Sequence, residues 1–223
     1  MLSYSFFVPS CFFYPRRSIV SYDCSLRKRL LDIVVSALLL VLLSPFLLII
    51  MLLIYRDSPG TVLFSQQRVG KQGKLFTMWK FRSMCLDAEK HKADLMKNNE
   101  SQKDVFRFKM KHDPRVTRFG QFIRKYSIDE LPQLWNVLIG DMSLVGPRPA
   151  LPDELAQYTP YERHRLDVTQ GITCLWQISG RSDLEFPEQV ELDLRYIKTL
   201  SFFNDILILL RTLPAVLTGR GAK

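Results

Sequence analysis

The sequence predicts an α+β fold, mainly helical, in which a small folded domain sits on an apolar membrane helix. Three observations indicate this class. Residues 33–55 contain no charged side chain, two short apolar runs separated by glycines follow at 62–81, and apolar residues then recur at helical spacing toward the C-terminus. For a chain of 223 residues, one domain is the default. We therefore divide the chain into a leader at 1–26, a membrane helix at 27–57 and a folded domain at 58–223.

The leader carries a run of aromatic side chains just before Arg16 and Arg17. Aromatic residues beside basic ones suit the interface between lipid and water. They are equally compatible with a segment that has no fixed structure. Both interpretations of residues 1–26 stay open.

The apolar segment at residues 33–55 is long enough to cross a hydrocarbon core of ~30 Å, so a single transmembrane helix is one alternative. A signal peptide fits poorly, because no small-residue cleavage site precedes Arg56. Ser44-Pro45 lies in the middle of the run. Proline removes a backbone hydrogen bond and kinks a helix, and in lipid the freed carbonyl must be satisfied by protein groups or by the Ser44 hydroxyl. Each half of a helix broken there is too short to cross, which indicates a re-entrant helix.

Basic side chains flank the apolar segment on both sides. The positive-inside rule places such residues on the cytoplasmic face. A re-entrant hairpin satisfies the rule at both ends and a spanning helix does not, so the re-entrant alternative is favoured. In either case the folded domain is expected on the cytoplasmic face. The flanking residues are Arg16, Arg17, Arg27, Lys28 and Arg29 before the segment, and Arg56, Arg68, Lys71 and Lys74 after it.

A β-hairpin is predicted next. A turn at residues 57–60 leads to a strand at 62–64, and glycines at 69–74 mark a second turn before a strand at 75–81. The following stretch, residues 84–111, has charges of both signs at helical spacing, and we interpret it as a solvated helix or loop.

Helical spacing of apolar residues returns in the second half of the domain. It predicts helices over residues 118–138 and 185–200. Residues 206–217 are strongly apolar, with Arg211 and Pro214 inside the run. That segment is either an amphipathic helix lying flat in the membrane interface or a helix packed into the core, and both remain open.

The formal charge of +9 indicates polyanionic partners: nucleic acid, an anionic membrane surface or phosphorylated substrates. No nucleic-acid reader motif is present, so no nucleic-acid partner is expected. The four cysteines are scattered, without a C-x-x-C pair or histidines at metal spacing, which argues against a zinc site or a disulfide framework.

Adjacent carboxylates at Asp129 and Glu130 allow two interpretations. In the first, Ser127 and Glu130 form a capping box, or Asp129 caps a helix that has Pro132 in its first turn. In the second, a helix start that attracts phosphate presents Asp129 as a nucleophile toward phosphorus, or presents both acids to a magnesium ion. The segment alone does not separate these alternatives.

Three arginines stand in short, turn-rich contexts that suit recognition of a diphosphate. Arg124 precedes the acid pair by five residues. Arg148 lies between two prolines, which leave its backbone little freedom to lose, and Arg181 follows Ser179-Gly180.

Four motifs occur in a fixed order along the chain, and together they resemble the bacterial sugar transferases, also called monotopic phosphoglycosyl transferases. The resemblance runs from about Arg27 to the C-terminus. The motifs are Lys80-Phe81-Arg82-Ser83-Met84, Ser127 to Gln133 around the acid pair, Asn136 to Pro149 ending in Gly-Pro-Arg-Pro, and Leu175 to Arg181.

The resemblance implies an enzyme of the bacterial inner membrane, held by a re-entrant helix broken at Ser44-Pro45. In that family the aspartate corresponding to Asp129 attacks the β-phosphorus of a UDP-sugar and releases UMP. Polyprenyl (undecaprenyl) phosphate then takes the sugar phosphate from the enzyme, in the first membrane step of exopolysaccharide, capsule or O-antigen assembly. The implied partners are therefore the UDP-sugar, polyprenyl phosphate and membrane lipid, with a homo-oligomer or downstream glycosyltransferases as further possibilities.

The resemblance also implies the roles of the site residues. Magnesium is required, and Asp129 and Glu130 would hold it, with Glu130 as metal ligand or base. The residues that would contact substrate phosphates are Lys80, Arg124, Arg148 and Arg181.

This chain departs from the family pattern in one loop. Where the family commonly has Pro-Gly-Ile-Thr-Gly, residues 170–174 begin with Gln170 and end with Cys174. The change raises the alternative of a catalytically impaired relative that serves as a membrane scaffold for glycan assembly. The chain also resembles the short form of the family, without the upstream helices of larger members.

Overall fold

The structure, a computed structural model, describes residues 22, 23, 25–88 and 113–219. Within these ranges the chain is mostly helical with two small two-stranded sheets. This confirms the α+β, mainly helical class. The predictions for the leader at 1–21 and for most of the charged stretch at 84–111 lie outside the described residues.

Helix α2, Leu26–Asp57, contains the whole predicted membrane segment. It begins at Ser25, whose hydroxyl accepts a hydrogen bond from the Lys28 amide at 3.3 Å. The helix continues through Pro45 without interruption. The Ser44 hydroxyl donates to the Val41 carbonyl at 2.7 Å, the acceptor that loses its backbone donor because proline has no N–H.

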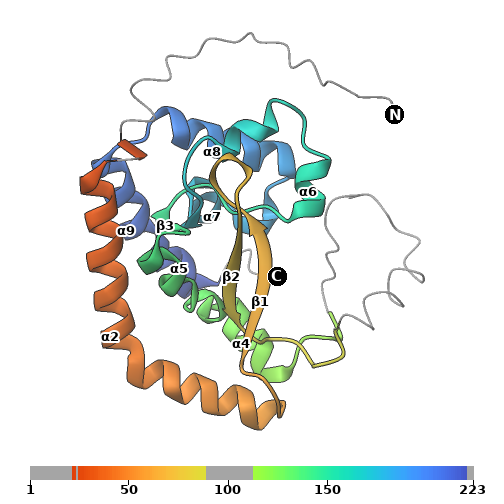
Figure 1. The fold of residues 1–223 in the computed structure, drawn as a ribbon. Helices are drawn as coiled ribbons and strands as arrows, with labels where there is room; N and C mark the ends of the chain where they lie inside the picture. The colour runs from red at the N-terminus through yellow and green to blue at the C-terminus, as the bar shows by residue number, and fades with distance from the viewer. Residues whose placement is uncertain (1–21, 24, 89–112, 220–223) are drawn as a thin grey trace, which may run out of the picture.

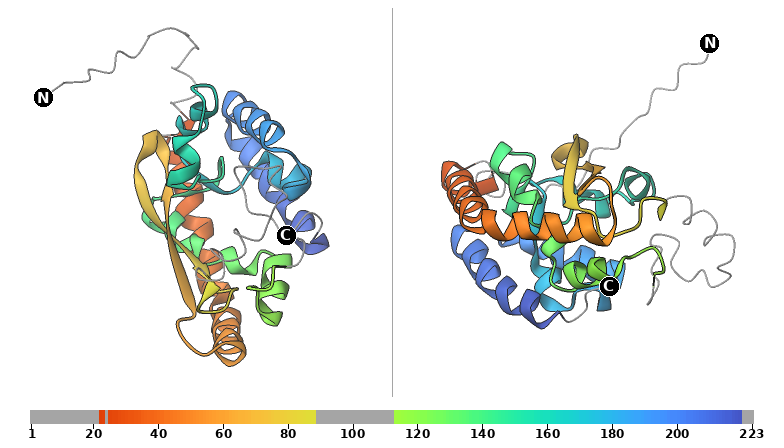
Figure 2. Two further views of the ribbon diagram at one scale, coloured as in Figure 1. Left: turned by 90° about the vertical axis from the view of Figure 1, so that its right-hand side faces the viewer. Right: turned by 90° about the horizontal axis from the view of Figure 1, so that it is seen from below.

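Figure 1 shows that α2 changes direction along its length, running down one side of the molecule and then along its lower edge. The view from below in Figure 2 shows the same two portions, one almost end-on and the other lengthwise. A proline inside a helix is a common cause of such a change. The helix therefore bends as one element instead of splitting into two.

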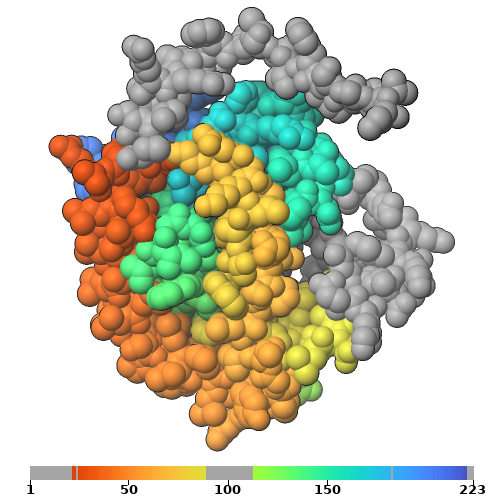
Figure 3. Space-filling model, in the orientation of Figure 1, coloured from red at the N-terminus to blue at the C-terminus, as the bar shows by residue number. Residues whose placement is uncertain are grey.

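Among the described residues, α2 is the one helix long and apolar enough to cross a membrane by length and composition. Only 11% of its most apolar window is buried, so it is not the core helix of a soluble domain. One stripe of α2 packs on the rest of the chain, with Leu39 and Leu40 against the main core and Leu47 against a second cluster. Lys28, Asp32 and Ser36 are buried near the start of the helix, and Ile50 and Ile54 near its end. In Figure 3, α2 forms the outer edge of the face shown.

Strands β1, Leu63–Val69, and β2, Leu75–Phe81, form the predicted antiparallel hairpin. The register pairs Leu63 with Phe81 and Val69 with Leu75, and a single 3₁₀ turn, η1, Lys71–Gly73, joins the strands. The hairpin prediction is confirmed, although β1 is longer than the predicted strand. Alternate residues of β2, Phe76 and Met78, enter the main core.

The prediction of one continuous helix over residues 118–138 is wrong, because the structure has two short helices there. Helix α4, Arg118–Lys125, ends before Ser127, which has φ of 53° in the left-handed region. A 3₁₀ turn, η2, Ile128–Glu130, and helix α5, Gln133–Ile139, follow. The capping alternatives are also wrong. Ser127 precedes η2 but its side chain makes no capping hydrogen bond there, and the N-cap position of α5 is occupied by Pro132 instead of Asp129.

A second sheet, which the sequence did not predict, lies at the centre. Strands β3, Ser143–Val145, and β4, Gly171–Thr173, pair in parallel. A Cβ atom on Gly171 would lie 2.1 Å from the Gly146 nitrogen, so glycine is required where these two segments meet. The short elements around this sheet are α6, Pro152–Ala156, η3, Glu162–Leu166, α7, Leu175–Ser179, and η4, Arg181–Asp183.

The last two helices, α8, Phe186–Lys198, and α9, Phe202–Thr218, confirm the C-terminal helical predictions. Figure 2 shows them on the side of the molecule opposite the hairpin. One face of α9 packs through Ile208, which is 1% exposed, while Phe203 on the outside is 84% exposed. α9 thus has one packed face, as the core alternative predicted, and one exposed apolar face, while its position in a membrane interface stays a prediction. Leu207, Leu210, Leu213 and Leu217 share this exposure.

Candidate active site

The acid pair lies in the η2 turn, between α4 and α5 and against strand β2. The left-handed Ser127 turns the chain after α4, and the 3₁₀ turn then directs both carboxylates inward. Asp129 is 8% exposed. These two acids therefore differ from ordinary surface carboxylates in their surroundings, and they also differ from each other.

Glu130 is held by two cations from other parts of the chain. Its Oε1 atom accepts from Lys80 Nζ at 3.0 Å and from Arg148 Nη2 at 3.0 Å. Burial opposes ionisation of this carboxyl, but Arg148 and Lys80 outweigh it and hold the pKa of Glu130 well below its usual range. Glu130 therefore carries a fixed negative charge.

Asp129 has a different environment. None of the described residues donates a hydrogen bond to its carboxylate, although Lys80, Arg124 and Arg148 are close enough to favour its ionised form. Burial outweighs them and, with the adjacent Glu130 charge, raises the pKa of Asp129 to about 6. At neutral pH Asp129 is thus an ionised carboxylate with an uncommitted lone pair.

The two other predicted arginines reach the same turn. Arg124 donates from Nε to the Ser83 hydroxyl at 2.8 Å and interacts electrostatically with Asp129. Arg181 donates from Nη2 to the Ser127 hydroxyl at 3.2 Å, and its Nη1 is buried without a hydrogen-bond partner among the residues that the structure describes. The six residues predicted to act on the substrate are therefore gathered around η2: Lys80, Arg124, Asp129, Glu130, Arg148 and Arg181.

Asn136 fixes the strand that carries Lys80 against the helix that follows the acids. Its amide nitrogen donates to the Thr77 carbonyl at 2.7 Å, and its oxygen accepts from the Trp79 amide at 3.1 Å. Asn136 is fully buried. The sequence motif that contains Asn136 indicates no role for its side chain. The local pattern likewise does not mark the Ser83 and Ser127 hydroxyls as acceptors for the two arginines.

The unusual residues of the 170–174 loop lie inside the domain. The side-chain amide of Gln170 donates to the carbonyls of Arg165 and Val168, at 3.0 and 2.9 Å. These two hydrogen bonds stabilise the loop at the position where the family commonly has proline. The Cys174 thiol is fully buried and donates to Gln177 Oε1 at 3.1 Å. The Cys174 thiol also lies close enough to interact electrostatically with Arg148, the partner of Glu130.

The acid pair fits a magnesium ion only as part of a shared site. The described residues contain no group of three or more carboxylate, histidine or cysteine side chains that could enclose a metal. Magnesium is often held by one or two carboxylates together with substrate phosphates. Asp129 and the Oε2 atom of Glu130 supply oxygen ligands of that kind, so the donor set suits an ion that arrives with a diphosphate.

Comparison with known protein families places these residues in context. Residues 24–219 match the family model described as "Bacterial sugar transferase". The chain belongs to the bacterial sugar transferase family. The match begins just before α2 and ends after α9, so it includes both the apolar helix and the acid pair.

Three curated relatives illustrate the similarity. The chain is 48% identical over 203 residues to "Galactosyl transferase CpsE" of Streptococcus agalactiae, covering 91% of this chain and 44% of the relative. It is 45% identical over 200 residues to "Undecaprenyl-phosphate galactose phosphotransferase" of Salmonella typhimurium, covering 87% and 41%. It is 39% identical over 197 residues to "Exopolysaccharide production protein ExoY" of Rhizobium meliloti, covering 87% of both. The chain thus spans less than half the length of the first two relatives.

Proposed function

We propose that this chain transfers a hexose-1-phosphate from a UDP-sugar to polyprenyl phosphate and releases UMP. The observation that carries the proposal is the division of charge within the acid pair: Glu130 is ion-paired to Lys80 and Arg148, while the adjacent Asp129 is ionisable and has no described donor. A relative 45% identical is named as an undecaprenyl-phosphate galactose phosphotransferase, which supports the reaction class.

In the first step an oxygen of the Asp129 carboxylate attacks the β-phosphorus of the UDP-sugar. A new O–P bond forms, the bridging P–O bond breaks, and UMP leaves with the bonding electrons. In the second step an oxygen of polyprenyl phosphate attacks the same phosphorus, and the Asp129 carboxylate is regenerated. The product is a polyprenyl-diphosphate sugar.

The surrounding cations suit this chemistry because they are already in place before substrate binds. Arg124, Arg148 and Arg181 would neutralise the diphosphate and stabilise the charge that develops on its oxygens. The low pKa of Glu130 makes it a poor base, so we assign it to orienting Lys80 and Arg148 and to metal binding. A bound Mg²⁺, held by Asp129 and Glu130 with the substrate, would supply additional charge neutralisation on the diphosphate.

Incubation with a UDP-sugar tests the proposal directly. The intact mass of the protein should increase by that of one hexose phosphate, with the adduct on Asp129 and one UMP released per protein. UDP-galactose is the first donor to try, followed by a series of other UDP-sugars, because relatives are named for galactose and N-acetylgalactosamine. Adduct mapping to another residue, or UMP release without any adduct, would contradict the proposed intermediate.

We further propose that α2 is re-entrant and that the folded domain lies on the cytoplasmic face. The direction change of α2, the basic residues near both its ends and the uncovered apolar face of α9 support this arrangement. Single cysteines in place of the exposed Arg27 and Arg56, introduced without other accessible cysteines, should both react with a membrane-impermeant thiol reagent only from the cytoplasmic side. Periplasmic reactivity at one of the two positions would instead establish a spanning helix.

The first half-reaction should lose activity in mild acid. Because burial raises the pKa of Asp129 from 3.8 to about 6, the nucleophile is protonated as pH falls through 6, and kcat/KM for the UDP-sugar should drop about tenfold per pH unit below it. Lys80→Met removes a cation that favours the ionised form, so its acid limb should lie at higher pH. An acid limb centred near 4 in the unsubstituted protein would contradict the burial of Asp129.

A further inference from the structure

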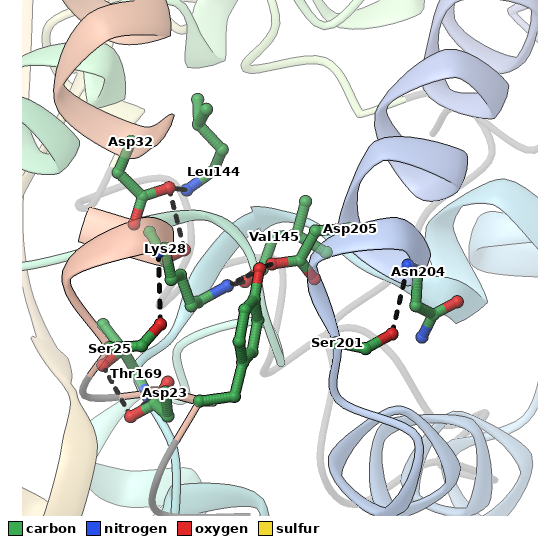
Figure 4. Close-up of polar contacts among 12 residues, drawn as sticks. Asp23, Ser25, Lys28, Asp32, Leu144, Val145, Thr169, Ser201, Asn204 and Asp205 are labelled. Carbon is green, nitrogen blue, oxygen red and sulfur yellow. Dashed lines mark hydrogen bonds and ion pairs between the residues drawn. The ribbon is translucent and has the colours of Figure 1, made fainter. Parts of the chain in front are cut away.

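The first two turns of α2 carry three charged side chains that reach into the folded domain. Lys28 and Asp32 are 2% and 4% exposed, and Arg29 lies between them, half-buried. Figure 4 shows Lys28 directed toward Val145 and Asp205, and Asp32 toward Leu144. The membrane helix is therefore attached to the domain by directed polar bonds as well as by apolar packing.

Arg29 attaches α2 to the end of α5. Its Nη1 and Nη2 atoms donate to the carbonyls of Val137 and Leu138, both at 2.7 Å. These carbonyls lie in the last turn of α5, where acceptors lack helical donors and where the helix dipole favours a cation. The other end of α5 is separated from Glu130 only by Leu131 and Pro132. Arg29 thus holds the short helix that immediately follows the acid pair.

Lys28 and Asp32 attach the same part of α2 to β3. Asp32 Oδ1 accepts from the Leu144 amide at 2.9 Å and from the Ser143 hydroxyl at 3.1 Å. Lys28 Nζ donates to the Val145 carbonyl at 3.0 Å. β3 ends at Val145 and leads directly into the Gly-Pro-Arg-Pro loop, so these bonds hold the strand from which Arg148 extends.

The two attached elements meet again at the site, where Arg148 pairs with Glu130 at 3.0 Å. A closed circuit of contacts therefore runs from α2 through α5 to Glu130, across to Arg148, and back through β3 to α2. Proline on both sides of Arg148, and the missing space for any Cβ at Gly146, leave the loop little freedom to adjust independently. A shift of α2 relative to either element would change the distance between Arg148 and Glu130.

We propose that Lys28, Arg29 and Asp32 are positioning residues, which set the placement of Arg148 against Glu130 from the membrane helix. The inference rests on the proposed function, since it assigns these residues to the alignment of that phosphate site. None of the three is itself among the residues gathered around η2. Their effect is transmitted through α5 and β3, and misplacement of a catalytic group by about 1 Å can reduce a rate by about 100-fold.

Arg29 offers the sharpest test, because it is only half-buried and its loss leaves no unpaired acid. The variants are Arg29→Gln and Arg29→Lys, with Arg27→Gln as the matched control. Arg27 is two residues away and exposed, so its replacement removes the same charge from the same end of α2. All are prepared as the full chain in the same lipid nanodiscs, and UMP release is followed with the UDP-sugar that labels the unsubstituted protein.

Arg29→Gln should lower kcat for UMP release about 10- to 100-fold with little change in KM, and should move the acid limb to higher pH as Arg148 loses its alignment. Arg29→Lys should recover part of the rate, because an ammonium can reach one of the two carbonyls. Arg27→Gln should behave like the unsubstituted protein. Hydrogen exchange by mass spectrometry gives a readout that does not need activity: peptides containing residues 143–148 should exchange faster in Arg29→Gln only.

Two results would overturn the inference. The first is a reduced Tm in Arg29→Gln with unchanged kcat, unchanged pH profile and unchanged exchange at 143–148, which would make Arg29 structural only. The second is an equal loss of rate in Arg27→Gln, which would indicate a general effect of charge. Absence of UMP release from the unsubstituted protein with every UDP-sugar would count against the proposed function instead, and the exchange data would still decide the placement of the loop.

Discussion

Asp129→Asn is expected to abolish sugar-phosphate transfer, with overall turnover reduced at least ~10⁴-fold, the scale observed when a covalent nucleophile is removed. The amide has nearly the shape of the carboxylate but lacks its charge and nucleophilicity. Because none of the described residues donates a hydrogen bond to Asp129, the substitution removes no internal contact that the structure describes. The fold should therefore persist while the chemistry is lost.

The assay is UMP release together with formation of radiolabelled polyprenyl-diphosphate sugar. Asp153→Asn is the matched control, since Asp153 is an exposed acid in the first turn of α6 and its change should leave both rates unaltered. The adduct on the protein should disappear only in Asp129→Asn. Normal turnover by that variant would exclude Asp129 as the nucleophile.

Lys28→Met is expected to cause the largest loss of stability. Lys28 pairs with Asp205 at 2.7 Å, and the two side chains are 3% and 1% exposed. Removal of the lysine leaves a buried carboxylate whose remaining donors, within the described part of the chain, are the hydroxyls of Tyr22 and Tyr196, at 3.3 and 2.8 Å. Breaking one partner of a buried ion pair costs about 3–5 kcal/mol. For a domain of this size that corresponds to a fall in Tm of roughly 6–20 °C.

Tryptophan fluorescence during heating in detergent micelles measures this effect. In Lys28→Met/Asp205→Asn the remaining charge is also removed, so much of the lost Tm should return. Asp167→Asn is the control: it breaks the exposed pair with His164, whose side chains are 52% and 60% accessible, and it should change Tm little. Equal shifts in Lys28→Met and Asp167→Asn would show that burial of the Lys28–Asp205 pair has no energetic consequence.

The sequence predicted those elements whose signals are local. The hairpin follows from glycines at the turn and apolar runs on either side, and the bounds of β2 were predicted as observed. The prediction of one helix over residues 118–138 was wrong because the apolar spacing continues across Ser127, while the backbone turns there through a left-handed conformation. Serine carries no marker for such a conformation, which arises from the tertiary packing of η2 against β2 and α4.

The candidate site was predicted in composition but not in geometry. The motifs identified Asp129, Glu130 and the surrounding cations. Glu130, however, pairs with two residues that are distant in the sequence: Lys80 lies 50 positions before it and Arg148 lies 18 positions after it. The Arg148 contact depends on β3, which pairs with β4, and both strands have three residues, too few to produce a periodic pattern. The Lys80 contact depends on the packing of β2 against η2, which no local pattern indicates. The pKa values of the two acids shift in opposite directions because of those contacts and of burial, and neither shift can be predicted from the adjacent residues in the sequence.

The side-chain amide of Asn136 also covers part of one outer edge of the β1–β2 hairpin. By bonding the Thr77 carbonyl and the Trp79 amide, it occupies backbone groups on the free edge of β2, while the Val69 amide of β1 is taken by the Ala150 carbonyl. Unpaired strand edges recruit strands from other molecules and lead to aggregation. One side chain and one loop therefore occupy backbone groups on both outer edges of this hairpin, which leaves fewer of them available to a strand from another molecule.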